Sequence, residues 1–132
     1  MNVGASSVTD AGDYFAWGEV VTKTEYSWNT YFDSSDEGST FTKYDTPNMI
    51  LEYSDDDARC NMGGCWRMPT IEEWKELRKN TDTSWTDEYN GTGVSGVICT
   101  SKTDATKSIF LPVTGHYNGT TKPSVMDSSP LL

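Results

Sequence analysis

Residues 69–80, PTIEEWKELRKN, carry the strongest local structural signal in the chain. Thr70 is placed to cap a helix N-terminus, and Glu73 follows three residues later, where its carboxylate can return to the Thr70 backbone N–H. The apolar positions then recur at helical spacing, namely Ile71, Trp74 and Leu77. We therefore predict a helix over residues 71–80 whose apolar face packs against a sheet.

Other segments predict the rest of an α+β domain. Asp55, Asp56 and Asp57 suit the N-terminus of a short second helix, because carboxylates accept hydrogen bonds from its free amides. Aromatic and β-branched residues predict strands at GDYFAWGEVV (12–21), VSGVICTS (94–101) and SIFLPV (108–113), and turns at Asn90-Gly91 and Asn118-Gly119. We expect a small, mainly antiparallel sheet that includes GDYFAWGE and SIFLPV. Residues 22–57 have no sustained period and predict long loops pinned by aromatic side chains.

One loop segment, DSSDEG (33–38), has side-chain oxygens at alternate positions and glycine in sixth place, as calcium loops do. The twelfth position, where a bidentate acid belongs, is Tyr44. This departure favours an exposed acidic turn over an EF-hand.

Length and charge narrow the classes of partner. A chain of 132 residues is long enough for one domain with its own core. Ten basic against twenty acidic residues give a net charge of -10, which opposes nucleic acid and anionic membrane surfaces. No stretch is apolar for long enough to span a bilayer, so we expect no direct membrane insertion.

Four motifs, in the order GDYFAWGE, KTEYSWNTY, GGCWRMPTIEEW and IFLPVTG, resemble the Fibrobacter succinogenes major paralogous domain family of bacterial surface and lipoprotein chains. The resemblance covers roughly residues 1 to 120. The WRMPTIEEW segment is also similar to the signature of formylglycine-generating, sulfatase-modifying domains. Both relatives imply a C-type lectin-like fold.

The resemblance also implies strands before NVGAS and after IFLP that this chain does not contain. We therefore expect one C-type lectin-like domain over residues 1–132, truncated at both ends, with exposed strand edges that favour self-association. Variable proteins of diversity-generating retroelements share the fold and diversify ligand-binding residues near the C-terminus. Membership in such a system stays open.

Three cysteines allow several chemistries. Cys60 and Cys65 have C-x4-C spacing, at the edge of the range for zinc ligands, and Cys99 with His116 would have to complete the set without forming a second knuckle. A Cys60–Cys65 disulfide is feasible because Gly63-Gly64 lets the loop turn back, and free thiols are the alternative. Cys99 lies in an apolar strand and is predicted to be a buried thiol. We expect no metal and no cofactor.

An enzyme is not expected. The sulfatase-modifying relatives carry their chemistry in a cysteine pair near the C-terminal end of their domain, and no such pair occurs here. His116 is the only histidine, and no serine or cysteine has a recognisable nucleophile context. The nearest segment to a lectin calcium triplet, Thr46-Pro47-Asn48, lacks the acid.

The remaining class is a binding or adhesion module at the bacterial surface or outside the cell, with a protein or glycan ligand on another cell or particle. Loop aromatics and their neighbours are the candidate ligand contacts: Trp85, Tyr89, Asn90, His116, Tyr117 and Asn118. Packing of these aromatics against the hairpins is the competing role. The alternatives are a relative of the sulfatase-modifying enzymes without their catalytic cysteines, or a structural surface domain without a ligand.

Overall fold

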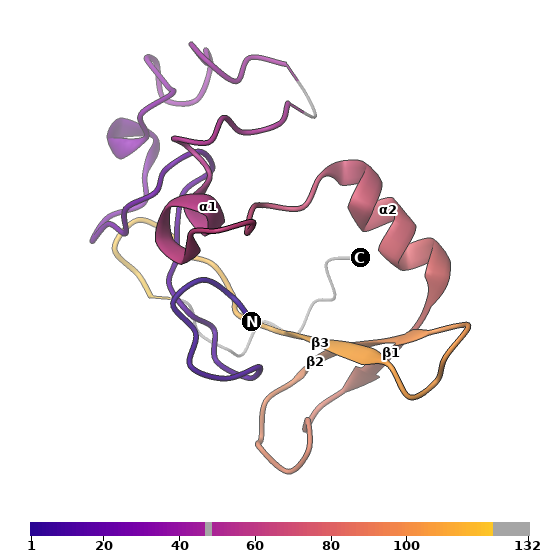
Figure 1. Ribbon diagram of the computed structural model, residues 1–132. Helices are drawn as coiled ribbons and strands as arrows, with labels where there is room; N and C mark the ends of the chain where they lie inside the picture. Colours follow the sequence, from indigo (N-terminus) through magenta and orange to yellow (C-terminus); the bar gives the residue numbers. More distant parts are fainter. Residues whose placement is uncertain (47–48, 123–132) are drawn as a thin grey trace. The chain divides into compact units, whose positions relative to one another are not determined.

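The structure, a computed structural model, describes residues 1–46 and 49–122. The described residues fall into two compact units, which we call the sheet unit (residues 1–12 and 69–115) and the loop unit (residues 13–46, 49–68 and 116–122). The elements along the chain, drawn in Figure 1, are η1 (Trp28–Thr30), α1 (Asp57–Met62), α2 (Ile71–Asn80), β1 (Thr81–Thr86), β2 (Gly96–Ser101) and β3 (Ser108–Pro112). Two α-helices and an antiparallel sheet confirm the predicted α+β class.

The sheet unit contains an antiparallel meander in the order β1-β2-β3. Thr83 of β1 and Ile109 of β3 both pair with the central Cys99 of β2. The predicted strands at 94–101 and 108–113 are confirmed with slightly shorter bounds. Strand β1 was not predicted, because Trp85 is its only large apolar residue and no hydrophobic alternation marks it.

Buried side chains lie on both faces of this sheet, because Phe110 pairs with Ile98 and Cys99 is the next residue of β2. Cys99 and Phe110 are buried, and Cys99 is thus confirmed as a buried thiol. The Tyr89 ring stacks on Phe110 with centroids 3.9 Å apart and an interplanar angle of 8°. At Gly96 a Cβ atom would lie 2.4 Å from the Leu111 carbonyl oxygen and 2.6 Å from the Phe110 ring, so close packing requires glycine at this position.

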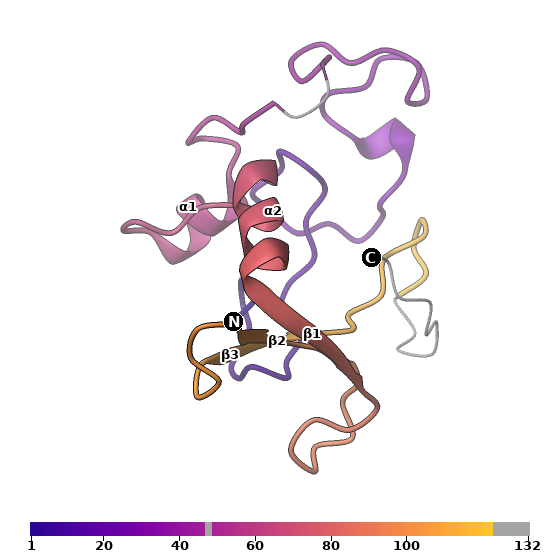
Figure 2. The same cartoon turned by 90° about the vertical axis from the view of Figure 1, so that its right-hand side faces the viewer.

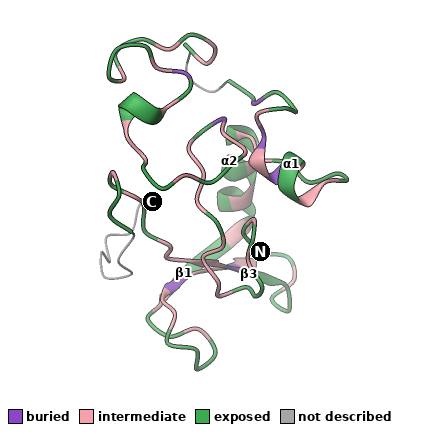
Figure 3. Ribbon diagram, turned by 90° about the vertical axis from the view of Figure 1, so that its left-hand side faces the viewer, coloured by how far each residue is buried: buried purple, intermediate pink, exposed green. Residues whose placement is uncertain are grey.

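Helix α2 has the predicted ends and capping box. The Glu73 amide donates to Thr70 Oγ1 at 3.3 Å, and the Thr70 amide donates to Glu73 Oε2 at 2.8 Å. The predicted packing of its apolar face is wrong, because Ile71 and Trp74 are 45% and 41% exposed and only Leu77 is half-buried. Figure 3 shows the helix mainly in the exposed colour.

The direct connection between α2 and β1 explains this difference. Asn80 ends the helix and Thr81 starts the strand, with no loop between them (Figure 2). The Lys102 amide, just after β2, donates to the Asn80 carbonyl at 3.0 Å, which ties the helix end to the sheet. A chain needs a loop to reverse its direction, and no loop separates α2 from β1. The helix therefore extends away from the start of β1 and does not fold back over the sheet.

The loop unit has little regular structure. Residues 12–21 do not form the predicted strand, because the Glu19 amide bonds to the Ala16 carbonyl at 2.9 Å in a tight turn and Gly18 has φ 77°. The prediction of long loops for 22–57 is confirmed for its described part before α1, which contains only η1 and isolated bridges.

Helix α1 begins with the predicted acidic run. Asp56 is its buried N-cap, and its two carboxylate oxygens accept hydrogen bonds from the amides of Arg59 and Met68, each at 2.9 Å. Leu51 and Ala58 are the buried apolar residues of this unit. Across the described part of the chain, none of the helices has both the length and the apolar character needed to cross a bilayer.

Candidate ligand-binding pocket

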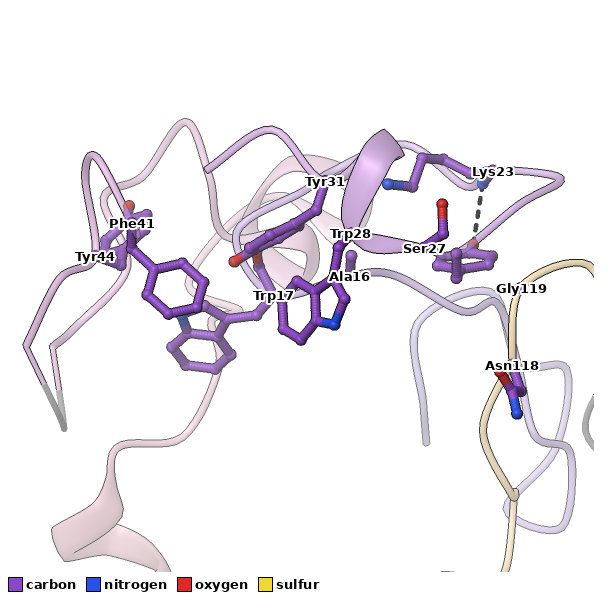
Figure 4. A pocket seen from close by; sticks show the side chains of 11 residues that line it. Ala16, Trp17, Lys23, Ser27, Trp28, Tyr31, Phe41, Tyr44, Asn118 and Gly119 are labelled. Carbon is purple, nitrogen blue, oxygen red and sulfur yellow. Dashed lines mark hydrogen bonds between the residues drawn. The ribbon is translucent and has the colours of Figure 1, made fainter. Parts of the chain in front are cut away.

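Aromatic side chains surround a cavity of about 580 Å³ in the loop unit (Figure 4). Six of the lining residues are aromatic: Trp17, Tyr26, Trp28, Tyr31, Phe41 and Tyr44. The others are small, polar or basic: Ala16, Lys23, Ser27, Asn118 and Gly119.

Asp33 holds one part of this wall in place. Its side chain is fully buried and accepts hydrogen bonds from the amides of Thr42, Lys43 and Tyr44 and from the Thr42 hydroxyl, the last at 2.8 Å. Burial alone would raise the pKa of this carboxyl, but the hydrogen bonds outweigh it and lower the pKa below 3.8. The carboxylate thus fixes the backbone that carries Phe41 and Tyr44.

This arrangement corrects the interpretation of DSSDEG as an exposed acidic turn. Asp36 and Glu37 are exposed, but Asp33 points inward and satisfies backbone donors. The oxygen that suggested a calcium ligand therefore has a structural role.

Trp28 is held from one side by a glycine. A Cβ atom at Gly38 would lie 2.7 Å from indole atom Cδ2, so the glycine backbone approaches the ring more closely than another residue could. Tyr31 and Phe41 lie near the same indole, with ring centroids 5.9 and 6.1 Å away. Even so, Trp28 is 53% exposed. The ring is supported but remains accessible.

The tyrosine hydroxyls of the pocket are engaged by the protein itself. Tyr26 donates to the Tyr14 carbonyl, Tyr31 to the Trp17 carbonyl at 2.8 Å, and Tyr44 to Asp55 Oδ2 at 2.7 Å. Burial raises the pKa of both Tyr31 and Tyr44, so each remains a protonated donor. These hydroxyls therefore orient the rings.

Lys23 is the only residue of the lining with a charged side chain, and its charge is compensated. Its ammonium lies 2.7 Å from Glu19 Oε2 and donates to the Thr30 carbonyl at 2.9 Å. Glu19 also accepts the Phe32 amide at 3.1 Å. Glu19 and Lys23 thus tie the segment before η1 to η1 and to the residue two positions after it. Because the two charges are paired, the pocket has no free charge.

The candidate contacts His116, Tyr117 and Asn118 have different positions in the loop unit. Tyr117 packs against the rings of Tyr14 and Tyr26, with centroids 5.2 and 4.7 Å away. His116 and Asn118 are exposed, and Asn118 lines the pocket. Its neighbour Gly119 exchanges two backbone hydrogen bonds with Tyr26, at 2.8 and 3.1 Å, which fixes this part of the rim.

The other three candidates belong to the sheet unit. Tyr89 stacks on Phe110, and the Trp85 indole donates to Asp87 at 2.7 Å. Asn90 occupies a turn with φ 49°. These contacts give Tyr89 and Asn90 roles in the hairpin loop, and a ligand contact at any of the three stays a prediction.

Cys60 and Cys65 are exposed free thiols, and the Cys60 thiol lies 3.3 Å from the Tyr53 carbonyl oxygen. Among the described residues, no group of three or more His, Cys, Asp or Glu side chains is arranged to hold a metal ion. In the segment Thr46-Pro47-Asn48, positions 47 and 48 lie outside the described residues.

No family model, curated protein or solved structure compared with this chain shows significant similarity to it. The functional argument therefore depends on the pocket. Sequence reasoning missed most of its wall, including Trp17 and Trp28, because it placed the binding residues at Asn-Gly turns. The available signal was the run of aromatics separated by Ser, Asp, Gly and Thr, a composition common in binding surfaces.

Proposed function

We propose that this chain is a ligand-binding module without catalytic activity, of C-type lectin-like fold, which acts at the bacterial surface or after secretion. The observation that carries the proposal is the aromatic pocket. Its volume of about 580 Å³ is that of a small-molecule site, and its lining combines many aromatic rings with few polar groups, as such sites do.

The exposure of the two tryptophans favours binding over simple packing. Trp17 and Trp28 are 47% and 53% exposed, although both line the same cavity. Single exposed apolar side chains are ordinary on protein surfaces, but a supported cluster marks a site where another molecule covers it.

A binding role also suits the chemistry of the lining. The ammonium of Lys23 is paired with Glu19, and the hydroxyls of Tyr26, Tyr31 and Tyr44 bond to the chain itself, so none is poised as a general base or nucleophile. His116, the only histidine in the sequence, is exposed. We propose a glycan or protein on another cell or particle as the ligand, with adhesion as the result.

The test is a binding screen of the full chain against immobilised glycans and bacterial and host surface proteins. We expect selective retention of one ligand class, which is lost in the double variant Trp17→Ala/Trp28→Ala. The matched control is Trp66→Ala/Trp74→Ala, which removes two exposed tryptophans outside the pocket. Absence of any selective ligand, or equal loss in both double variants, would overturn the proposal and leave the structural surface domain.

A further inference from the structure

The pocket offers flat rings for contact with a ligand. In Figure 4 the side chains of Trp17, Trp28, Tyr31 and Phe41 gather at one end, and Asn118 lies at the other. The face of an aromatic ring carries partial negative charge and attracts polarised C–H groups. A pyranose ring presents several such C–H groups on one face, and its hydroxyls point outward around the rim.

Two polar groups of the pocket are available to those hydroxyls. Within the described part of the chain, neither the indole N–H of Trp28 nor the carboxamide of Asn118 makes a hydrogen bond. A carboxamide offers both a donor and an acceptor, which matches a pair of neighbouring hydroxyls. The backbone of Asn118 is fixed by two hydrogen bonds with Thr121, at 3.0 and 3.2 Å, so the carboxamide extends from an ordered part of the rim.

The charges in and around the pocket oppose an anionic ligand. The ammonium of Lys23 is paired with Glu19 at 2.7 Å, which leaves it poorly able to bind an anion. The net charge of -10 opposes anions further.

A proline-rich peptide is the main competitor, because it also docks on aromatic rings. Such a peptide needs donors for successive backbone carbonyls. The hydroxyls of Tyr26, Tyr31 and Tyr44, which could serve this purpose, donate to the protein itself. The free polar groups suit a compact polyhydroxylated ligand better.

From these observations, and on the basis of the proposed function, we infer that the pocket binds a neutral saccharide without calcium. The sugar ring stacks on the exposed indoles of Trp17 and Trp28, and the Asn118 carboxamide selects the orientation of two hydroxyls.

The test begins with the full chain on an array that contains neutral oligosaccharides, sialylated and uronate-containing oligosaccharides, and proline-rich peptides, all in the presence of EDTA. We expect binding to a subset of the neutral sugars. The dissociation constant for the best of them is then measured by calorimetry, and saturation-transfer NMR identifies which face of the sugar meets the protein.

Trp28→Ala should weaken binding of that sugar at least about tenfold, because it removes a stacking ring. Trp28→Phe, which keeps a smaller ring, should retain part of the affinity. Asn118→Ala should reduce the preference between epimers that differ at a single hydroxyl. Trp66→Ala, in the same unit but outside the pocket, is the control and should bind as the unmodified chain does.

The outcomes separate this inference from the proposed function. Selective binding of charged sugars or of peptides, lost in Trp28→Ala, would overturn the saccharide assignment and keep a binding module. Binding of a neutral sugar that EDTA abolishes, or that Trp28→Ala does not change, would overturn the calcium-independent stacking site. Absence of binding in every class would overturn the saccharide assignment, and the protein arm of the earlier binding screen would then decide the proposed function.

Discussion

The two units of this chain satisfy their backbone hydrogen-bonding groups in different ways. In the sheet unit, the amides and carbonyls of three strands pair with one another in a continuous register. In the loop unit, carboxylates accept the hydrogen bonds of irregular backbone, as Asp33 does for residues 42–44 and Asp56 for Arg59 and Met68. Backbone without a ladder is therefore ordered by a few buried acids, and its stability depends on them individually.

The largest effect is expected from Asp33→Ala. The substitution leaves the amides of Thr42, Lys43 and Tyr44 without their acceptor, and we expect a loss of about 3–5 kcal/mol in the stability of the loop unit. Hydrogen exchange resolved by residue should show faster exchange at these amides and little change in β2.

Asp36→Ala is the matched control for this substitution, because it removes an exposed carboxylate from the same turn. It should change stability by less than about 0.5 kcal/mol. Similar effects of the two substitutions would show that the buried acid is not what orders this region.

A smaller loss of stability, in the sheet unit and not in the loop unit, is expected from Gly96→Ala. The new Cβ would lie 2.4 Å from the Leu111 carbonyl oxygen, and overpacking of this kind costs about 1–3 kcal/mol. Amides of β2 and β3 should exchange faster, and those at Thr42 and Tyr44 should not. Ser84→Ala, at an exposed position of β1, is the control. Equal acceleration in both units would mean that they unfold as one.

The smallest effect is expected from mild acid. The folded-state pKa of Asp33 is lowered, so its contribution to stability is present above 3.8 and is lost as the pH falls through the lower folded value. Asp55, whose pKa is lowered by hydrogen bonds from Lys43 and Tyr44, adds to the same trend. Loop-unit NMR signals should therefore weaken first when the pH falls from about 5 to about 3. Earlier loss of the β2 signals would contradict this order.

The sheet unit could be predicted from the sequence better than the loop unit. Helix α2 and strands β2 and β3 could be predicted because each has a local signal: a capping box with helical spacing for the helix, and short runs of β-branched, aromatic and other apolar residues for the strands. The strand at GDYFAWGE is not formed although its residues favour β structure, because the chain turns at residues 16–19 and no pairing partner lies beside it among the described residues.

The candidate site was less predictable for a related reason. The inward orientation of Asp33 depends on amides nine to eleven residues away, a separation that no local pattern reveals. Asn118 is exposed and lines the pocket, and its role as a ligand contact stays a prediction. The support of Trp28 by Gly38 is a tertiary contact, and neither residue indicates it alone.

The backbone bridge between Tyr26 and Gly119 has a consequence for the chemical ageing of the protein. An asparagine followed by glycine converts to isoaspartate in two steps: the glycine nitrogen attacks the side-chain carbonyl with loss of ammonia, and water then opens the resulting succinimide. At Asn118 that nitrogen donates to the Tyr26 carbonyl at 3.1 Å, so its attack requires the bridge to open. At Asn90 the Gly91 nitrogen makes no hydrogen bond in the described structure. Peptide mapping of stored protein should find isoaspartate at position 90 well before position 118. The pocket rim should therefore retain the Asn118 carboxamide after the hairpin has lost that of Asn90.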